Sequence, residues 1–407
     1  MELSDHPRKL KIAIILDRFQ PSRGGESYFS WLAQELSKRG HEVHIFSRVT
    51  EEMDRMDYQI HRIPVWKYPR SLRMLSFLIN TARVVQLFDF DIIHGVEGTL
   101  TMSIFNPHEG VEKAYLRQEF RSIPNRVYYL YKILKRYLSP SHYLKLWIQK
   151  KQYLSRRVKR IIAISKMVKE DIIRYYGVPE EKITVIINCV DANRFHPKNR
   201  DRYRNEIREQ LGIDTNDMVL LFVGNNYRLK GVEPLLRAKA LLRRRFPKTP
   251  ICLLIVGRGQ SWYYKRLTKR IGLLDHTFFL GSVKEIERYY SASDIYVHPT
   301  FYDSCSLTVL EAMASGLPVI TSRFNGAADM ILSDEGGRVL EDPRDIEKLA
   351  DSIACFFNEE QRKNAQIVTR QWVERYSPTY HIEEILRVYY EVAEESNFEF
   401  KKRENET

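Results

Sequence analysis

Short apolar runs alternate with amphipathic stretches in the first half of the chain. The run "KIAIILD" (residues 11–17) is rich in isoleucine, which is typical of a strand buried on both faces. After a loop that contains two glycines, the apolar residues of "YFSWLAQELSKRG" (28–40) recur at helical spacing until Gly40. An order of strand, helix and strand predicts a parallel sheet with crossover helices. Further strands are predicted in "HEVHIFSR" (41–48), "FDFDIIHG" (88–95) and "RIIAIS" (160–165).

The same alternation restarts in the second half of the chain. Helical patterns such as "GVEPLLRAKALLRRRF" (231–246) separate five short apolar runs. The interval between the halves, residues 190–217, carries many charges and few large apolar residues, which is typical of a domain linker. The pattern therefore predicts two α/β domains. The five runs are "MVLLFVG" (218–224), "ICLLIVG" (251–257), "TFFLG" (277–281), "DIYVHP" (294–299) and "LPVITS" (317–322).

These patterns divide the chain into five parts. Residues 1–190 are expected to form the first domain, 191–216 the linker and 217–375 the second domain. The spacing of the apolar residues in 376–395 predicts an amphipathic helix, and the polar residues 396–407 are expected to be disordered. The length of 407 residues agrees with two or three domains, at roughly 150 residues for each.

Composition argues against a secreted or membrane-spanning protein. The four cysteines lie far apart in the sequence, so they indicate neither a disulfide framework nor a thiolate metal site. A charged start precedes an apolar run that is too short for a signal peptide, and no stretch reaches the roughly 18 apolar residues of a membrane span. We therefore expect a cytoplasmic protein, either soluble or peripheral on a membrane.

Positive charge is concentrated in residues 111–160. This segment carries 14 basic and 2 acidic residues, so its net charge of +12 accounts for nearly all of the +13 of the chain. Nine aromatic residues are interleaved with the cations. Such a segment suits the headgroup level of an anionic membrane, although it also suits nucleic acid or an ordinary solvated helical face. The candidate membrane or acceptor surface comprises Lys132, Lys135, Arg136, Lys150 and Lys151.

Two carboxylates mark the stretch "FYDSCSLTVLEAMASGLPVI" (301–320), which follows a predicted strand. The strand, loop and helix pattern places the amides of Ser306 to Thr308 at the carboxyl edge of a parallel sheet, where open α/β sheets bind ligands. Helix N-terminal amides bind an anion such as a diphosphate, whereas Asp303 and Glu311 accept hydrogen bonds from paired sugar hydroxyls. A nucleotide sugar offers both groups. The alternative is a turn or capping role for Asp303 and an exposed helix position for Glu311.

The spacing of these two acids, with "AMASGLPVI" after the second, resembles the signature of the retaining glycosyltransferases of family four. That family has the GT-B fold, in which two Rossmann-like domains face a cleft, and the resemblance implies that the C-terminal helix crosses back to the first domain. It also implies that Asp303 lies beside the hydroxyls of the transferred sugar and that Glu311 binds the ribose. The family has glutamate at both positions and a glycine-rich loop between them, so the donor choice stays open here. The donor-binding loop of this chain is Ser304, Cys305, Ser306 and Leu307.

Further motifs resemble the family in the same order along the chain. In "VGNNYRLKGVEPLL", Lys230 and Arg228 match the phosphate-binding loop of the family. The resemblance implies that the Lys230 ammonium stabilises the negative charge that grows on the leaving diphosphate. In "PSRGGES", Gly24 and Gly25 match the glycines that let the backbone approach the donor phosphate. In "NPHEGVEKAY", His108 matches an active-site histidine near the donor sugar. The matches to the nucleotide-base region are Gly257, Arg258 and Val283.

The resemblance implies transfer of a hexose, expected to be glucose, from a UDP-sugar with retained anomeric configuration and with no metal or other cofactor. Within the family, the basic segment and the "RLKGVE" loop are most similar to the lipopolysaccharide core glucosyltransferases. The implied partners are a saccharide or lipid-linked acceptor, such as the lipopolysaccharide inner core, and the anionic inner face of the cell membrane. The alternatives are another polysaccharide or lipid carrier as acceptor, and a non-catalytic protein that binds nucleotide sugars.

Two other classes fit the sequence less well. A nucleic-acid-binding protein would leave the ordered donor-site motifs unexplained, so we expect no nucleic acid partner. A Rossmann dehydrogenase would need Gly-x-Gly-x-x-Gly at the first strand-to-helix turn, and this chain lacks it there.

Overall fold

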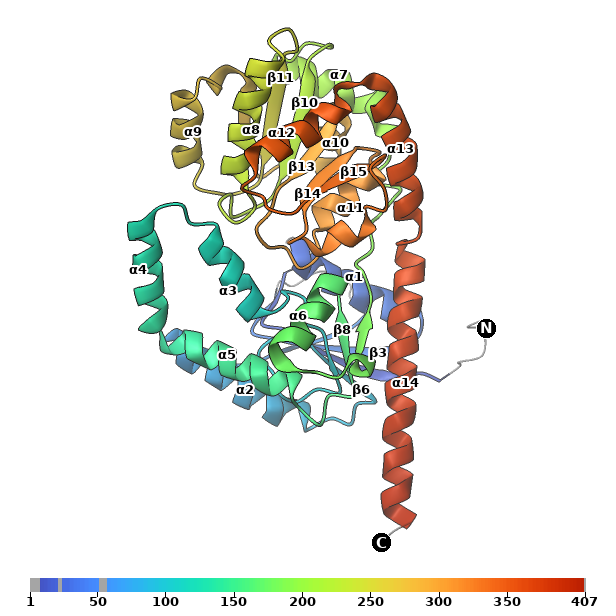
Figure 1. Ribbon diagram of the computed structural model, residues 1–407. Coiled ribbons are helices and arrows are strands. Elements are labelled where there is room, and N and C mark those ends of the chain that lie inside the picture. Colours follow the sequence, from blue (N-terminus) through green and yellow to red (C-terminus); the bar gives the residue numbers. More distant parts are fainter. Residues whose placement is uncertain (1–7, 21–23, 51–56, 406–407) are drawn as a thin grey trace.

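Two parallel sheets form the centres of two α/β domains, one above the other in Figure 1. The structure is a computed structural model that describes residues 8–20, 24–50 and 57–405. This arrangement confirms the predicted GT-B architecture.

The first domain contains a seven-stranded parallel sheet in the order β5-β3-β1-β6-β7-β8-β9. Side chains of β1 point alternately to two separate cores, with Ile12 and Ile14 in one and Ala13 and Ile15 in the other. This burial on both faces explains why the strand is an unbroken apolar run. The strands of this domain are β1 (Lys11–Ile15), β3 (Glu42–Ser47), β5 (Gln59–Arg62), β6 (Ile92–Gly95), β7 (Ile104–Phe105), β8 (Arg160–Ala163) and β9 (Ile183–Val185), with β2 (Arg18–Phe19) and β4 (Val49–Thr50) in a separate pair.

Six helices are described in the first domain. Three of them, α3, α4 and α5, fall within the basic segment; α3 and α4 project towards the second domain, whereas α5 packs against α2 and α6 of the first domain (Figure 1). The helices are α1 (Gly24–Lys38), α2 (Arg70–Val85), α3 (Glu112–Arg121), α4 (Arg126–Tyr137), α5 (Pro140–Tyr153) and α6 (Lys166–Tyr176).

The second domain contains a six-stranded parallel sheet in the order β12-β11-β10-β13-β14-β15. The strands are β10 (Met218–Val223), β11 (Ile251–Val256), β12 (Thr277–Gly281), β13 (Ile295–His298), β14 (Val319–Ser322) and β15 (Gly337–Leu340). Its helices are α7 (Asn199–Leu211), α8 (Val232–Arg245), α9 (Ser261–Arg270), α10 (Ile286–Ala292), α11 (Leu307–Ala314), α12 (Ile346–Ala354) and α13 (Glu359–Glu374). Short 3-10 helices lie at Glu180–Lys182 in the first domain and at Leu274–His276, Gly326–Met330 and Cys355–Phe357 in the second domain.

The segment predicted as a linker contains helix α7, which belongs to the second domain. Arg204 and Arg208 of α7 donate to the carboxylate of Asp294 at 2.7 and 2.8 Å, and Asp294 immediately precedes β13. The high charge of this segment therefore reflects an ion-pair network and not only solvation. The predicted linker, residues 191–216, therefore includes a helix that packs against the second domain.

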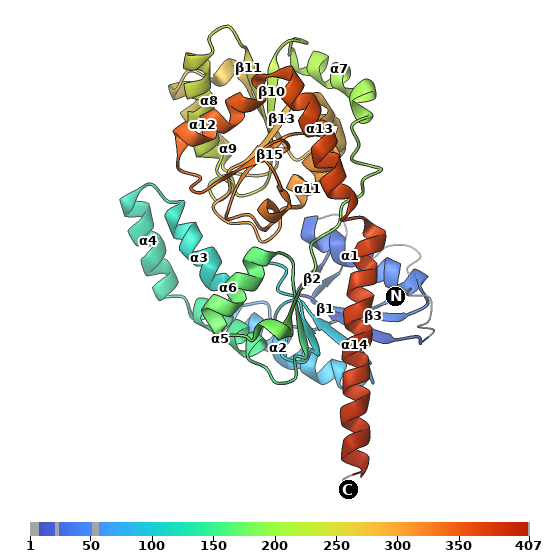
Figure 2. The same ribbon diagram turned by 45° about the vertical axis from the view of Figure 1, so that its right-hand side comes forward.

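The last helix, α14 (Pro378–Asn405), lies along the first domain in both Figures 1 and 2, as predicted. Two side chains of α14 form hydrogen bonds with the first domain. His381 Nε2 lies 2.8 Å from the hydroxyl of Tyr28, and the hydroxyl of Tyr389 lies 2.6 Å from His94 Nδ1. The helix continues to Asn405, so the prediction of a disordered tail from residue 396 is wrong.

Candidate functional site

The loop that carries Asp303 contacts the first domain at the carboxyl edges of the two sheets. Ser304 Oγ donates to the carbonyl of His108 at 2.9 Å, and Ser165 Oγ donates to the carbonyl of Ser304 at 2.8 Å. The amide of Val111 donates to the hydroxyl of Tyr302 at 3.0 Å. The predicted histidine and the first predicted acid are thus brought to one place from opposite domains.

Asp303 and Lys230 form a close ion pair at this place. Lys230 Nζ lies 2.5 Å from Asp303 Oδ2 and also donates to the carbonyl of Tyr302 at 3.2 Å. Burial alone would raise the pKa of Asp303, but the Lys230 ammonium and the His298 ring hold it well below its usual range. Asp303 is therefore a carboxylate at neutral pH, and Lys230 is held where it points at the Asp303 loop.

Gly231 explains how the backbone brings Lys230 so close to this loop. Its φ is +81°, and a Cβ at this position would lie 2.0 Å from the carbonyl oxygen of Pro299. Only glycine permits both the left-handed conformation and this approach.

Glu311 lies on α11 and is half-buried, so the alternative that it is an exposed helix residue is wrong. The hydroxyl of Tyr290 donates to Glu311 Oε2 at 2.8 Å, and no described residue donates to Oε1. Burial raises the pKa of Glu311 to about 7. One carboxyl oxygen is thus left for an external hydroxyl group.

The N-terminus of α11 offers fewer open amides than the sequence suggested. The amide of Ser306 donates to Asn325 Oδ1 at 3.2 Å, so it is already used. The amides of Leu307 and Thr308 donate to no described acceptor, and the first turn of α11 contains no acidic residue. Cys305 is buried, and burial raises the pKa of its thiol to about 12.

Arg228 does not point at the Asp303 loop as Lys230 does. Its guanidinium donates to the carbonyl and carboxylate of Glu119 at 3.0 and 3.3 Å and to the hydroxyl of Ser122 at 2.5 Å. Glu119 and Ser122 lie on or next to α3, so Arg228 links the two domains. Its donor-binding role stays a prediction.

The residues predicted for the base region line the edge of the second sheet. Gly257 has a φ of +117°, and a Cβ there would lie 2.3 Å from the carbonyl oxygen of Gly224. The amide of Arg258 donates to Asn225 Oδ1 at 2.7 Å. Val283 is half-buried in the segment that follows β12. Their contacts with a base stay predictions.

Gly24 and Gly25 are the first two residues of α1, after the end of the small strand β2. The other residues of that predicted loop, 21–23, lie outside the described residues.

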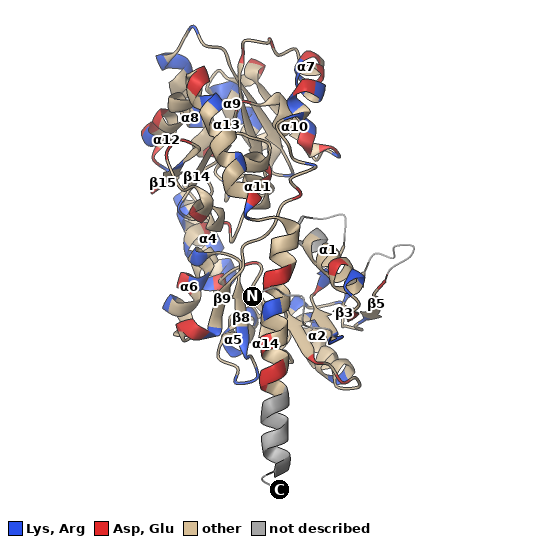
Figure 3. Ribbon diagram, turned by 90° about the vertical axis from the view of Figure 1, so that its right-hand side faces the viewer, with Lys and Arg blue, Asp and Glu red and all other residues tan. Residues whose placement is uncertain are grey.

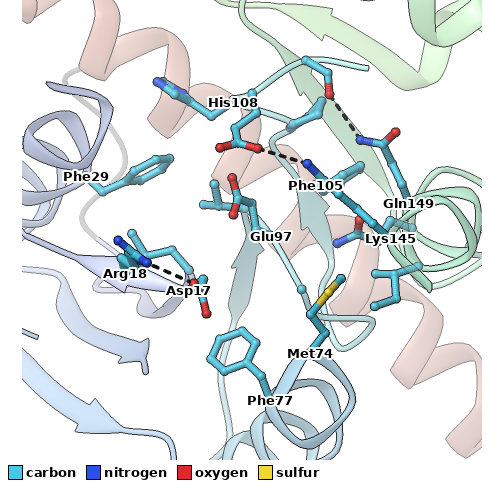
Figure 4. A pocket seen from close by; sticks show the side chains of 18 of the residues that line it. Asp17, Arg18, Phe29, Met74, Phe77, Glu97, Phe105, His108, Lys145 and Gln149 are labelled. Carbon is cyan, nitrogen blue, oxygen red and sulfur yellow. Dashed lines mark hydrogen bonds and ion pairs between the residues drawn. The ribbon is translucent and has the colours of Figure 1, made fainter. Parts of the chain in front are cut away.

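A cavity of about 760 Å³ opens beside His108; the first domain lines most of it, and Asn225 of the second domain also lines it (Figure 4). The His108 ring stacks on Tyr28 with 5.0 Å between ring centroids, and burial lowers the pKa of His108 to about 4, so the imidazole is neutral at pH 7. Glu97 lies near the centre of the cavity in Figure 4, with Lys145 and Gln149 on one side.

The charged residues of this cavity were not predicted from the sequence. One signal was available, because Glu97 follows closely on strand β6, at the edge where parallel sheets bind ligands. The other charged residues come from β2, α2, α5 and separate loops, and only the fold brings them together. The missed residues are Asp17, Arg18, Arg70, Arg73, Glu97, Glu109 and Lys145.

The predicted basic surface is organised differently from the expectation. Lys132 and Arg136 turn inward to Glu119, whose side chain is 5% exposed, so they are not free cations. Lys135, Lys150 and Lys151 are exposed, and Figure 3 shows basic residues along α4 and α5. No residue of α4 is buried. The exposed apolar and aromatic residues of α4 and its end include Val127, Leu130, Leu134, Tyr137 and Leu138.

Metal-binding clusters and membrane-spanning helices are both absent from the described residues. Within residues 8–20, 24–50 and 57–405, no group of three or more His, Cys, Asp or Glu side chains is placed to hold a metal ion. Among the helices of the same residues, none is both long and apolar enough to cross a bilayer.

Comparison with known proteins identifies the family. The Glycosyltransferase Family 4 model matches residues 22–194, and the Glycosyl transferases group 1 model matches residues 203–372. An uncharacterized glycosyltransferase of Methanocaldococcus jannaschii is 24% identical over 344 residues, which are 81% of this chain and 84% of that protein. The lipopolysaccharide glucosyltransferase WaaG of Escherichia coli is 20% identical over 340 residues, 83% of this chain and 87% of WaaG.

Solved structures show the same fold. A crystal structure of WaaG superposes with a TM-score of 0.76 at 19% identity and covers 92% of this chain and 98% of its own. Anabaena HepE, in a crystal structure with UDP and glucose, superposes with a TM-score of 0.70 at 18% identity and covers 93% of this chain and 99% of its own. Since the two family matches span both domains, the chain is a glycosyltransferase of the family-four type with the GT-B fold.

Proposed function

We propose that this enzyme transfers a hexose, glucose above all, from a UDP-sugar to a saccharide or lipid-linked acceptor with retained anomeric configuration. The observation that carries the proposal is the convergence of Lys230, Asp303 and the start of α11 at the carboxyl edge of the second sheet, against His108 of the first domain. The choice of donor is supported by HepE, which has the same fold and was crystallised in complex with UDP and glucose.

Each group at the site suits one part of a nucleotide sugar. The open amides of Leu307 and Thr308 and the ammonium of Lys230 stabilise the diphosphate as its negative charge grows. The free oxygen of Glu311 accepts from the ribose, and Asp303 accepts from a hydroxyl of the transferred sugar.

In this reaction the bond between the anomeric carbon and the diphosphate oxygen breaks, and the acceptor oxygen forms the new bond on the same face. The acceptor proton passes to the departing diphosphate, so the step consumes no other reactant. The Lys230 ammonium and the amides of α11 stabilise the negative charge of the leaving diphosphate, and we propose that no metal ion or other cofactor takes part.

We propose an acceptor at an anionic membrane surface, with the lipopolysaccharide inner core as the first candidate because of the similarity to WaaG. The unburied apolar and aromatic residues of α4 suit the headgroup region, and Lys135, Lys150 and Lys151 suit anionic lipid. The enzyme then works from the cytoplasm on the inner face of the cell membrane.

The test measures binding and slow hydrolysis of UDP-, GDP- and ADP-sugars by the full chain. We expect UDP-glucose to bind most tightly, Glu311→Ala to weaken UDP binding at least tenfold, and Asp303→Ala chiefly to slow turnover. Glu335→Ala, at an exposed position of the second domain, is the matched control. Unchanged binding and turnover in both site variants would refute the assignment.

A further inference from the structure

Two arginines of α2 line the same cavity as His108 and have no side-chain partner in the described part of the chain. Arg70 and Arg73 are spaced so that they share one helix face with Met74 and Phe77, which also line the cavity. Phe77 is 2% exposed and fixes this face against the domain. Neither guanidinium makes a hydrogen bond or an ion pair with any of the residues that the structure describes.

Apart from Glu97, the other charged residues that line the cavity are paired within the protein, and Arg18 lies 3.8 Å from Asp17. Asp17 accepts two hydrogen bonds from Arg48, at 2.8 and 2.7 Å. Lys145 lies 3.5 Å from Glu109 and 2.8 Å from Glu112. Arg70 and Arg73 are therefore surplus positive charge at the wall of a concave site.

Two further features add to this positive potential. The first turn of α2 contains no acidic residue, and its cap Pro69 supplies no side-chain hydrogen bond, so the helix dipole is uncompensated at Arg70. Burial, followed by the nearby Glu109 carboxylate, raises the pKa of Glu97 well above its usual range, which favours the neutral carboxyl group and so reduces the negative charge in the cavity.

A surplus cation on an open helix face is often only solvated, but these two lie in a cavity that leads to the donor site. The wall near His108 offers the carboxyl groups of Glu97 and Glu109, which suit sugar hydroxyls. The wall at Arg70 and Arg73 offers two planar forks of donors, which match the oxygens of phosphate or carboxylate.

We propose that this cavity binds the acceptor and that the acceptor is a sugar with an anionic group, held by Arg70 and Arg73. The proposal rests on the proposed function. A hydroxyl of the same sugar then lies at the Glu97 and His108 wall, where it meets the donor sugar held by the second domain.

Binding of three sugars in the presence of UDP tests this inference. Glucose 6-phosphate and glucuronate carry the two kinds of anionic group, and glucose carries neither. We expect at least one charged sugar to bind at least tenfold more tightly than glucose, and the tighter of the two identifies phosphate or carboxylate. The double variant Arg70→Gln/Arg73→Gln should lose this advantage while its affinity for glucose and UDP stays unchanged.

Arg83→Gln is the matched control, because Arg83 is exposed on α2 and does not line the cavity. Equal affinities for charged and neutral sugars, or an advantage that survives the double substitution, would overturn the inference. UDP binding by the unsubstituted chain is read in the same titration. If UDP fails to bind, the proposed function itself fails, whereas UDP binding without discrimination among the sugars removes only the acceptor inference.

Discussion

The ammonium of Lys230 lies 2.5 Å from the carboxylate of Asp303, and both groups lie at the contact between the two domains. The pair keeps a half-buried aspartate ionised and keeps a cation next to the start of α11. In the proposed function, a diphosphate bound at Lys230 would compete with Asp303 for the ammonium, so the two proposed roles would be coupled.

Lys230→Gln should destabilise the protein by about 2 kcal/mol at pH 7, because it leaves the Asp303 carboxylate without its cation. The folded-state pKa of Asp303 is depressed, so the stability from this pair is present above pH 3.8 and is lost as the pH falls through the folded pKa. Urea unfolding at pH 7 and in acid should show a large loss at pH 7 that shrinks in acid. The double variant Lys230→Gln/Asp303→Asn should recover the stability that Lys230→Gln loses, but it should not recover sugar transfer. A loss of stability in Lys230→Gln that does not depend on pH would contradict the prediction.

Glu311→Gln should be more stable than the natural chain at pH 8, although it binds UDP more weakly. The Glu311 carboxyl titrates near pH 7 in the folded protein and near 4.5 when unfolded, so the folded state holds an extra proton between these values. The neutral Glu311 carboxyl group therefore makes its whole contribution to the free energy of unfolding below pH 4.5. This contribution, up to about 3 kcal/mol, is lost as the pH rises through 7. Denaturant titrations from pH 5 to 8 measure this slope. Glu335→Gln, at an exposed site, should leave it unchanged, and an identical slope in Glu311→Gln would refute the prediction.

Gly231→Ala should displace Lys230 and abolish transfer. The added Cβ meets the carbonyl of Pro299 at 2.0 Å, so the loop has to move, at about 3 kcal/mol of stability. Gly40→Ala is the control, because Gly40 has a φ of +85° with nothing within 4 Å of its Cβ and should cost only about 1 kcal/mol. Melting temperature and turnover of both variants are compared. Equal effects of the two substitutions would show that backbone conformation alone is responsible.

Leu130→Gln/Leu134→Gln should reduce binding to both neutral and anionic vesicles without loss of stability, because these side chains are 64% and 58% exposed. Replacing Lys135, Lys150 and Lys151 by Gln should reduce binding to anionic vesicles only. Co-flotation with phosphatidylcholine vesicles, with and without phosphatidylglycerol, measures both effects. Undiminished flotation of the leucine variant would remove α4 from the membrane surface.

Much of the fold could be predicted because the buried parallel strands are unbroken apolar runs, as β1 and β10 show. The Asp303 and Glu311 pair could be found because both acids lie on one strand, loop and helix unit. The orientation of α4 could not be predicted, because it depends on ion pairs that Lys132 and Arg136 form with the buried carboxylate of Glu119. The cavity was also missed, since Arg70, Glu97 and Lys145 come from distant segments.

Helix α14 also sets an order of events during synthesis. His381 and Tyr389 fill contacts with Tyr28 and His94 in the first domain, yet the ribosome makes them only after the entire second domain. The face of the first domain that α14 covers therefore stays uncovered until the second domain has been synthesised.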